Sequence, residues 1–368
     1  MKLLHFSDTH LGFSEYYKID SETGLNQREQ DFYQAWSQVI QAILDHQPDL
    51  VVHAGDLFHT PRPSNRAIRT AMEGIQKISD AGIPMFIISG NHETPRIRST
   101  GSIFESLELF PHVFTAYSSR YQTFDLENIL IHCLPHCSLS EELEEAFACI
   151  QINEEKLNIL VAHGAWGGKS YGMGEFNEQR LPDIESHTGC RFTYIALGHY
   201  HRYVAINDHT FYCSSTERTS LNEHNSTCGY LLVDLSTGDR SYHEIDTRPM
   251  VRHPEIDCTG LTTASIYQEL ETLASLTPEH AIVQISLSSI ESDVFLKLDT
   301  QAIDELFEHT FYLEKAFTRR IGNTGHVSNP EKLESLPLEF ERYIENLPDL
   351  ELDKKRLQKL GASFLVKD

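Results

Sequence analysis

The stretch LLHFSDTH, residues 3–10, is the part of this sequence that decides both the fold and the site. Its first four residues form a short, mostly apolar run, which is typical of a buried β-strand. The run leads directly to Asp8 and His10, whose side chains are common ligands of divalent cations. Because alternate residues of an extended chain point to the same side, Asp8 and His10 can approach one ion together.

The same pattern occurs four more times in the first 201 residues. The stretches are VVHAGD (51–56), FIISGNHE (86–93), ILVAHG (159–164) and IALGHYH (195–201). One such motif alone is weak evidence, because a lone histidine is more often packed or exposed than bound to a metal. Five motifs in order, each after an apolar run, favour a site for two metal ions where the strands end. The carboxylate, imidazole and amide groups suit Mn²⁺, Fe²⁺ or Zn²⁺, and the lack of a thiolate disfavours a structural zinc site.

Amphipathic stretches separate these apolar runs. Buried strands are predicted at residues 3–6, 50–53, 85–88, 129–132, 158–162 and 194–197. Helices are predicted near residues 30–45, 65–81, 102–109 and 140–151. Two further strand-like runs, at 211–212 and 230–234, follow without a helix between them. The alternation of strand and helix indicates an α/β fold with a layered sheet.

A second unit is expected after Thr247-Arg248-Pro249, where proline interrupts the pattern. Helices near 264–274 and 299–308 and strands at 281–287 and 311–317 predict a compact α/β unit. Residues 321–330 have the composition of a linker. The final segment carries a helical apolar stripe at Phe340, Tyr343, Ile344, Leu347, Leu357, Leu360 and Phe364. This stripe could pack on its own domain or dock a partner, and the sequence favours the two equally.

The composition narrows the class of protein. With 368 residues, 40% hydrophobic and 23% charged, the chain is typical of a globular protein of about two domains. Its 30 basic and 54 acidic residues give a net charge of −24, which argues against bulk attraction of nucleic acid. The seven cysteines form no CxxC pair, so a reducing cytoplasm is the expected location. The sequence predicts neither a secretory signal nor a membrane span.

Taken together, these motifs carry a resemblance to a known family. The ordered set Asp8-x-His10, Gly55-Asp56, Gly90-Asn91-His92, His163 and Gly198-His199-x-His201 resembles the calcineurin-like metallophosphoesterases. Finer features resemble the DNA-repair branch of that family, the SbcD-like nuclease subunits of double-strand-break repair complexes. These features are GDLFH (55–59) with RPS (62–64), NHETPR (91–96), YGMGEFNEQ (171–179) and STERTS (215–220).

The resemblance implies a fold and a domain organisation. It implies an α/β protein whose core, residues 1–248, is a layered β-sandwich flanked by helices and carries the nuclease activity. Residues 249–320 would form a smaller α/β capping domain. Residues 321–368 would form a linker and a helical C-terminal segment.

It also implies a role for each site residue. Asp8, His10 and His201 would hold one metal ion, and Asn91, His163 and His199 the other. Asp56 would bridge both ions. His92 would lie beside the scissile phosphate, and His59 would stand near it on the substrate side. From the chemistry of phosphodiester hydrolysis, His92 could protonate the departing sugar oxygen as a general acid or stabilise it as a cation. The implied cofactors are two divalent ions, Mn²⁺ first, with Mg²⁺, Fe²⁺ or Zn²⁺ as alternatives.

The implied activity is DNA phosphodiester hydrolysis, by exonuclease or endonuclease cleavage, in DNA repair or processing. A coiled-coil ABC ATPase would dock on residues 335–365, and the chain could form a homodimer. The alternatives are a phosphoesterase for small nucleotides or phosphoproteins and a non-catalytic scaffold. A scaffold is disfavoured because every expected ligand is present.

Two positions depart from the family pattern, and several others remain open. Ser214 stands where the family usually has glycine, and Glu93 replaces the commoner aspartate. Arg62, Arg96 and Arg98 follow metal-binding loops and could contact phosphates or pair with carboxylates. The stretch HCLPHC (132–137) is interpreted as a strand end followed by a loop rather than as a second metal site.

Overall fold

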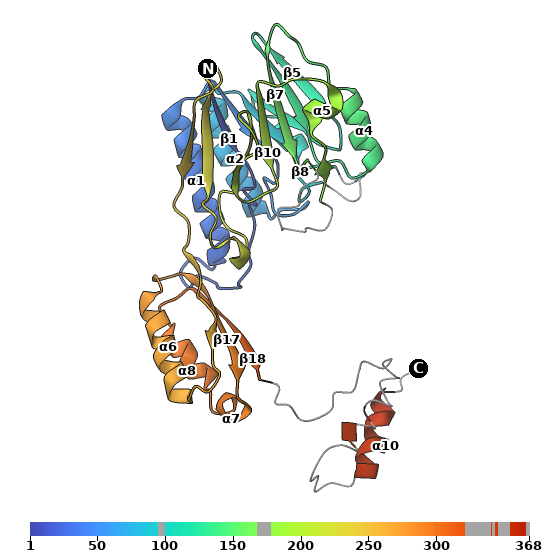
Figure 1. Cartoon of the computed structure of the whole chain (residues 1–368). Coiled ribbons are helices and arrows are strands. Elements are labelled where there is room, and N and C mark those ends of the chain that lie inside the picture. Colours follow the sequence, from blue (N-terminus) through green and yellow to red (C-terminus); the bar gives the residue numbers. More distant parts are fainter. Residues whose placement is uncertain are drawn as a thin grey trace.

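The computed structural model describes residues 1–94, 99, 101–167, 178–320, 340, 343–344 and 354–365. Figure 1 shows a larger part made of two sheets with helices outside them, and a smaller part made of residues 250–319. The C-terminal helix α10 spans Lys354–Leu365.

The first sheet has six strands in the order β14-β13-β1-β2-β3-β4. Strands β1 to β4 are parallel, and β13 runs antiparallel to both of its neighbours. The strands are β1 (Lys2–Phe6), β2 (Leu50–His53), β3 (Met85–Ile88), β4 (Val113–Ala116), β13 (Gly229–Asp234) and β14 (Arg240–Glu244).

The second sheet also has six strands, in the order β11-β12-β10-β7-β6-β5. The four central strands are parallel, and the edge strands β5 and β11 are antiparallel to them. The strands are β5 (Gln122–Leu126), β6 (Ile129–Leu134), β7 (Leu157–His163), β10 (Tyr194–Gly198), β11 (Tyr203–Ala205) and β12 (Thr210–Cys213).

The two sheets pack face to face because each buries residues on both sides. In β1, Leu4 and Phe6 contact the helices, while Leu3 joins a core shared with the second sheet. Ile159 and Val161 of β7 belong to the same shared core. Since alternate residues of a strand point to opposite faces, a fully apolar strand predicts such a doubly buried sheet.

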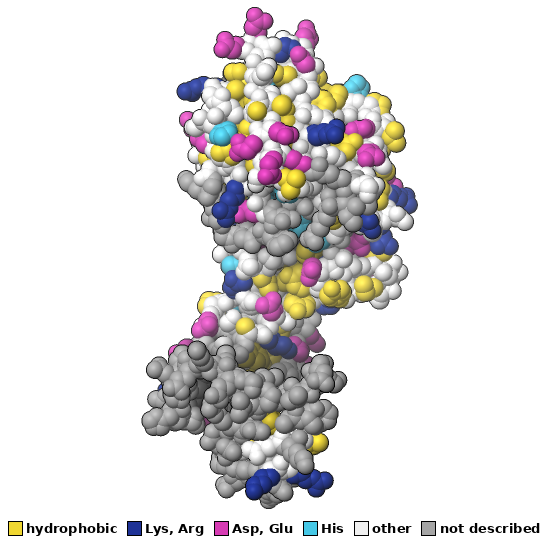
Figure 2. Space-filling view, turned by 90° about the vertical axis from the view of Figure 1, so that its right-hand side faces the viewer, with side chains coloured by type: hydrophobic (Ala, Val, Ile, Leu, Met, Phe, Trp, Pro, Cys, Tyr) yellow, Lys and Arg dark blue, Asp and Glu magenta, His cyan; other side chains and the backbone are white. Residues whose placement is uncertain are grey.

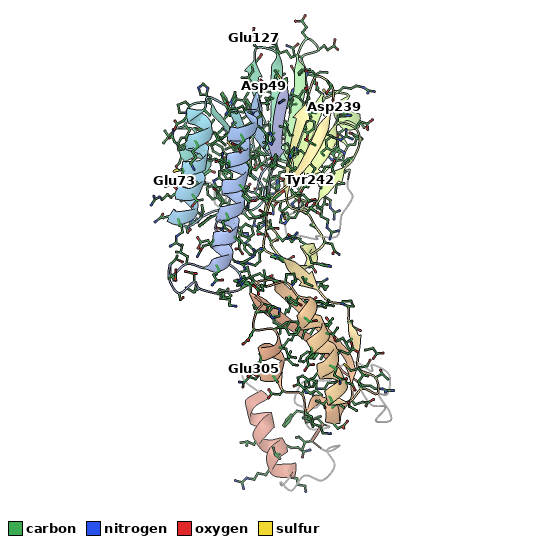
Figure 3. All side chains as sticks on the ribbon, turned by 90° about the vertical axis from the view of Figure 1, so that its left-hand side faces the viewer. Asp49, Glu73, Glu127, Asp239, Tyr242 and Glu305 are labelled. Carbon is green, nitrogen blue, oxygen red and sulfur yellow. The ribbon has the colours of Figure 1, made fainter. Side chains whose placement is uncertain are left out.

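Helices α1 (Gln27–His46) and α2 (Asn65–Asp80) cover the outer face of the first sheet, side by side (Figure 3). Asn26 and Ser64 cap the two N-termini by accepting backbone N–H groups. The helices come close at Gly74, where a Cβ atom would collide with the indole of Trp36. The Trp36 Nε1 donates to the Thr70 carbonyl at 3.1 Å, which fixes the ring.

Shorter elements complete the larger part. Phe147 of α4 (Ser140–Ala148) and Ile184 of α5 (Ile184–Thr188) pack against the outer face of the second sheet. The remaining elements are α3 (Phe104–Leu107), β8 (Ala165–Trp166), β9 (Arg180–Leu181) and the 3-10 helix η2 (Leu221–Glu223).

The smaller part is a parallel four-stranded sheet built around β17 (Ile282–Ile290). Its other strands are β15 (Met250–Arg252), β16 (Ile256–Asp257) and β18 (Tyr312–Arg319), and its helices are α6 (Thr263–Leu276), α7 (Ser292–Phe295) and α8 (Thr300–Leu306). Met250, Ile282 and Phe311 pack with Leu221 and Tyr16 of the larger part. This small apolar cluster joins the two parts.

The predicted α/β fold class, with a layered core, is confirmed. The helix expected over 102–109 is wrong in length, since only Phe104–Leu107 is helical. The pattern missed the four edge strands of the two large sheets, β4, β5, β11 and β14, of which β5, β11 and β14 lack a continuous apolar run. The linker expected at 321–330 lies outside the described residues. Within the described part of the chain, no helix combines the length and apolarity that crossing a membrane requires.

Candidate metal centre

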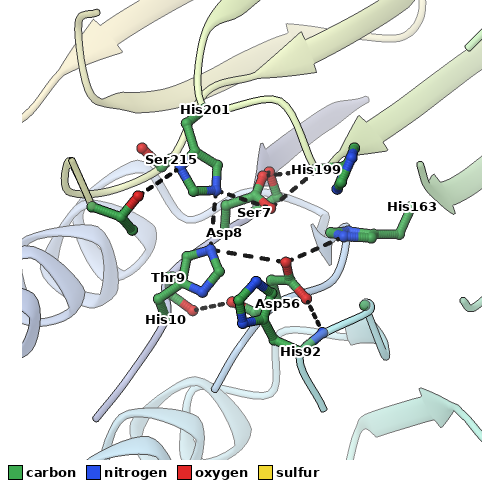
Figure 4. A network of polar contacts seen from close by, with 12 residues as sticks. Ser7, Asp8, Thr9, His10, Asp56, His92, His163, His199, His201 and Ser215 are labelled. Carbon is green, nitrogen blue, oxygen red and sulfur yellow. Dashed lines mark hydrogen bonds and ion pairs between the residues drawn. The ribbon is translucent and has the colours of Figure 1, made fainter. Parts of the chain in front are cut away.

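Five strand ends converge at one edge of the two packed sheets. Strands β1, β2 and β3 are parallel neighbours, so the loops that follow them emerge together. Strands β7 and β10 pair in register from the second sheet, with Gly198 opposite His163. The five predicted motifs, which are far apart in sequence, thereby bring their side chains into one network (Figure 4).

A first cluster consists of Asp8, His10 and His201, all buried. The Nε2 atoms of His10 and His201 are 3.0 Å apart, and His201 Nε2 is 4.0 Å from Asp8 Oδ1. Two imidazole nitrogens that face each other at 3.0 Å can be satisfied by a shared proton or by a cation between them. This is the trio that the family resemblance assigns to one metal ion.

A second cluster surrounds His163. Its Nε2 lies 3.3 Å from Asp56 Oδ2 and 2.9 Å from Asn91 Oδ1. The His199 ring is 5.3 Å from the His163 ring, and the His199 backbone N–H donates to both Asp8 oxygens, at 3.0 and 3.1 Å. The structure therefore places Asn91, His163 and His199 next to the carboxylates of Asp56 and Asp8.

The Asp56 carboxylate lies between the two clusters. Its Oδ2 is 3.8 Å from His10 Nε2 in the first and 3.3 Å from His163 Nε2 in the second. Its Oδ1 accepts the backbone N–H of His92 at 3.0 Å. This position is the one that a carboxylate shared by two cations requires.

Hydrogen bonds to the backbone and to a carboxylate fix the rings of two candidate ligands, His163 and His201. His163 Nδ1 donates to the Ala54 carbonyl at 2.8 Å, which directs Nε2 to the cluster. His201 Nδ1 lies 3.0 Å from Glu223 Oε1, and Glu223 also accepts from the backbone and hydroxyl of Thr219. A histidine held in this way is a typical metal ligand, because the partner sets its tautomer and raises its basicity.

The loops that carry the candidate ligands adopt unusual backbone conformations. Asp8, His10, Asp56 and His199 have φ angles of 52°, 41°, 56° and 105°, in the left-handed region. Each such conformation costs about 1–3 kcal/mol and is typical of functional sites. Gly90 is required for a different reason, since a Cβ atom there would collide with the Asp56 carboxylate.

The buried carboxylates and imidazoles of the site shift one another's pKa values. Burial raises the pKa of Asp8 to about 6, whereas burial and the nearby His92 lower the pKa of His10 well below its usual value. Burial disfavours charge on Asp56 and His163, but their mutual attraction outweighs it. The pKa of Asp56 therefore falls well below normal, and that of His163 rises to about 9. Buried carboxylates and imidazoles in direct contact form a donor set that suits divalent ions such as Mn²⁺, Fe²⁺ and Zn²⁺.

His92 and His59 lie at the open side of this cluster, both partly exposed. His92 Nδ1 is 2.9 Å from the His59 carbonyl, and the two rings stack with centroids 5.1 Å apart. The His92 ring also meets that of His10 at 4.7 Å. Both predicted catalytic residues therefore stand beside the candidate ligands.

Sequence reasoning missed several residues that support the ligands. Glu223 holds His201, Glu178 Oε1 lies 3.4 Å from His199 Nε2, and the Ser7 hydroxyl donates to Asp8 Oδ2 at 2.5 Å. Glu178 lies within the stretch YGMGEFNEQ (171–179), but that motif assigns it no role. No spacing rule marks Glu223, which reaches the site from the 3-10 helix η2. Ser7 could have been suspected, since it directly precedes Asp8 in the first motif.

Glu93 and Ser214, the two residues that depart from the family pattern, also make hydrogen bonds near the site. Glu93 is buried, which raises its pKa to about 8, and it accepts the backbone N–H groups of Phe58 and Gly90. Ser214 has a φ of 77°, and its carbonyl oxygen is 3.4 Å from the Ser7 hydroxyl. Ser214, which stands where the family usually has glycine, therefore contacts through its carbonyl oxygen the same Ser7 hydroxyl that donates to Asp8.

The structure also places other predicted residues. Arg62 is exposed, and Arg96 and Arg98 lie outside the described residues. His132 Nδ1 lies 2.6 Å from the Tyr121 hydroxyl, and His132 Nε2 lies 3.1 Å from Asn158 Oδ1. Strand β6 ends at Leu134, and residues 135–137 are neither strand nor helix, which agrees with the interpretation of HCLPHC as a strand end followed by a loop.

With this geometry established, comparison with known proteins defines the class. The calcineurin-like phosphoesterase family matches residues 1–203, more than half of the sequence, and the chain belongs to that family. Its relatives include archaeal proteins named DNA double-strand break repair protein Mre11. The one from Thermoplasma acidophilum is 32% identical over 267 residues, which cover 68% of this chain and 67% of that protein. The one from Methanococcus maripaludis is 31% identical over 260 residues, which cover 67% of this chain and 66% of that protein.

A solved structure shows a more distant likeness. The crystal structure of TT1561 from Thermus thermophilus matches with a TM-score of 0.41 and 11% identity, over 67% of this chain and 99% of that one. The predicted family, and its branch of DNA-repair proteins, are confirmed by the family match and the named relatives. The chain is therefore a metal-dependent phosphoesterase with a centre for divalent cations.

Proposed function

We propose that this protein is a two-metal DNA nuclease that acts in DNA repair. The observation that carries the proposal is the position of Asp56, with one carboxylate oxygen facing both clusters and the other held by His92. The two relatives named for DNA double-strand break repair support DNA as the substrate.

Asp8, His10 and His201 would hold one cation, Asn91, His163 and His199 the other, and Asp56 both. Two divalent cations, when bound, neutralise the phosphate oxygens and lower the pKa of a water molecule toward neutrality. The ligands are preorganised for this task, since their loops are fixed by backbone hydrogen bonds such as Asp8 N to Gly55 O and His10 N to Asp56 O, both 3.0 Å.

His92 would assist departure of the sugar oxygen. The His59 carbonyl accepts from Nδ1, which stabilises the protonated ring that a general acid needs. The backbone N–H of His92 is tied to Asp56, so the ring keeps a fixed place relative to the candidate ligands. His59, stacked on His92, would border the substrate on the outer side.

Mn²⁺ is the metal we propose first, with Mg²⁺, Fe²⁺ or Zn²⁺ as alternatives. The donor set mixes carboxylate, amide and imidazole groups, which is intermediate between the oxygen ligands of Mg²⁺ and the nitrogen-rich sites of Zn²⁺. Metal analysis of the purified protein and reconstitution of the metal-free protein with each ion would identify the native metal.

The second candidate function is a phosphoesterase for small nucleotides or phosphoproteins. The same metal centre could serve it, and the net charge of −24 favours it over bulk DNA binding. Side-by-side assays of labelled duplex DNA, single-stranded DNA, a nucleoside monophosphate, a phosphopeptide and an aryl phosphodiester would separate the two. DNA cleavage far below turnover of the small substrates would contradict the nuclease assignment.

Further parts of the proposal concern assembly and location. A coiled-coil ABC ATPase would dock on residues 335–365, of which 340, 343–344 and helix α10 are described. Deletion of this segment should abolish co-purification with such an ATPase, and unchanged co-elution would refute the docking site. The division into domains 1–248, 249–320 and 321–368, a homodimer and a cytoplasmic location are also proposed on the resemblance and the cysteine content.

A further inference from the structure

A cleft of about 540 Å³ opens in front of the candidate metal centre. One end is lined by His10, His59, His92 and His201. Such a volume is in the range of sites that bind small organic ligands. Figure 2 shows hydrophobic side chains gathered where the larger part narrows toward the smaller one. An exposed histidine side chain lies close to them.

The other end of the cleft is aromatic and is built from both parts of the chain. Tyr16 and Tyr17 come from the loop after β1, and Tyr312 is the first residue of β18. The Tyr16 and Tyr312 rings meet edge to face with centroids 4.8 Å apart. Tyr17 is 86% exposed and Tyr312 38% exposed, so their ring surfaces remain accessible to a ligand.

Contacts with Phe311 fix the loop that carries Tyr16 and Tyr17. Lys18 Nζ donates to the Phe311 carbonyl at 2.5 Å, and the Tyr16 ring packs against Phe311 with centroids 6.4 Å apart. Tyr16 and Tyr17 have φ angles of 67° and 44°, two consecutive left-handed residues that are not glycine. The fold thus presents these aromatic rings beside the metal centre at a cost in backbone strain.

The charge of this end selects what can bind there. Glu15 and Glu314 line it together with the tyrosines. Two carboxylates repel a phosphate, so the sugar–phosphate backbone would favour the histidine end, where cations bind. A neutral nucleobase can instead stack on a tyrosine and donate its amino group to a carboxylate.

We propose that Tyr16, Tyr17 and Tyr312 form a subsite for one unpaired nucleobase of the strand whose phosphate lies at the metal centre. The inference rests on the proposed nuclease function and names its substrate class, a single-stranded or frayed DNA end. A base inside a duplex is already stacked on its neighbours, so it must leave the duplex to use this surface.

Equilibrium binding without cleavage tests the subsite directly. Single-stranded oligonucleotides with nuclease-resistant phosphorothioate linkages carry 2-aminopurine at successive positions, and the full-length protein is titrated into each in the presence of Mg²⁺. Stacking on tyrosine should quench the fluorescence at one position. Tyr312→Leu should remove the quenching and weaken binding about 10-fold, the scale of one base–aromatic stack. Tyr312→Phe, which keeps the ring, is the matched control and should retain both.

Cleavage gives the second measurement. The wild-type protein should cleave an oligonucleotide with an abasic site at the subsite position about 10-fold more slowly than the intact one. In Tyr312→Leu and Tyr17→Leu this ratio should fall toward one, while thermal melting shows that the variants are folded. Equal cleavage of intact and abasic strands by the wild type, or quenching unchanged in Tyr312→Leu, would overturn the subsite. Position-specific quenching without any DNA cleavage would instead support the subsite and refute the nuclease function.

Discussion

Glu223 Oε1 lies 3.0 Å from Nδ1 of His201, and this contact turns the opposite ring nitrogen toward Asp8 and His10. Glu223 is itself buried, and although burial opposes its ionisation, the nearby His201 keeps its pKa below the usual value. The carboxylate is therefore charged at neutral pH and can support a metal-bound imidazole. The first ligand cluster depends on a residue that is not one of its predicted ligands.

Removing this support should weaken metal binding. Glu223→Ala is expected to lower affinity for the bound ion about 10- to 100-fold, the usual effect of losing such a partner. Glu223→Gln, which keeps an acceptor but loses the charge, should have a smaller effect. Calorimetric titration of the metal-free protein with Mn²⁺ measures both. Equal affinity in wild type and Glu223→Ala would show that the contact is dispensable.

His92 should be needed for turnover but not for metal binding. His92→Ala is expected to reduce DNA cleavage about 100- to 10,000-fold, because the leaving oxygen loses its proton donor. The backbone N–H that holds Asp56 remains in this variant, so metal content should stay near that of the wild type. Metal analysis and nuclease rates measured on the same preparation check the prediction. Metal loss in proportion to activity would place His92 among the ligands instead.

The contact between α1 and α2 should not tolerate a side chain at Gly74. Alanine normally favours a helix over glycine by about 1 kcal/mol, but here its Cβ would collide with the Trp36 indole. The net effect of Gly74→Ala is expected to be a loss of up to about 2 kcal/mol in the free energy of unfolding. Gln76→Ala, at an exposed position of the same helix, is the control. Urea unfolding measures both, and a more stable Gly74→Ala would show that the helices can separate at little cost.

His5 should make the protein sensitive to acid. It is fully buried, its Nδ1 lies 3.0 Å from the Tyr194 hydroxyl, and burial lowers its pKa to about 3. Between the unfolded pKa of about 6.5 and the folded pKa of about 3, the unfolded chain binds the extra proton. His5 therefore supports the folded state fully above pH ~6.5, and this support is lost as the pH falls toward ~3.

The size of this effect can be isolated by substitution. The pKa difference corresponds to about 4 kcal/mol between pH ~7 and pH ~3. His5→Gln, which does not titrate, should show a correspondingly shallower loss of stability over this range. Both proteins are unfolded by urea at several pH values in the presence of a chelator, so that metal release does not contribute. Parallel pH profiles would show that His5 is not the group responsible.

Much of the site could be predicted because its ligands are local features of the sequence. Asp8, Asp56, Asn91, His163, His199 and His201 each follow an apolar strand, and parallel strands bring such positions to one edge. Strand pairing supplies the long-range arrangement that the motifs do not contain.

The sequence by itself determined the alternation of strands and helices and the residues at the strand ends, because burial and turn formation act on neighbouring residues. Only the tertiary structure decided that Glu223 supports His201 and that Tyr16 meets Tyr312 across the cleft. A glutamate in a short 3-10 helix and a tyrosine at the start of a strand carry no local signal of a site. Their roles arise from the packing of two sheets and of the smaller part against the larger, which brings together side chains from opposite ends of the described chain.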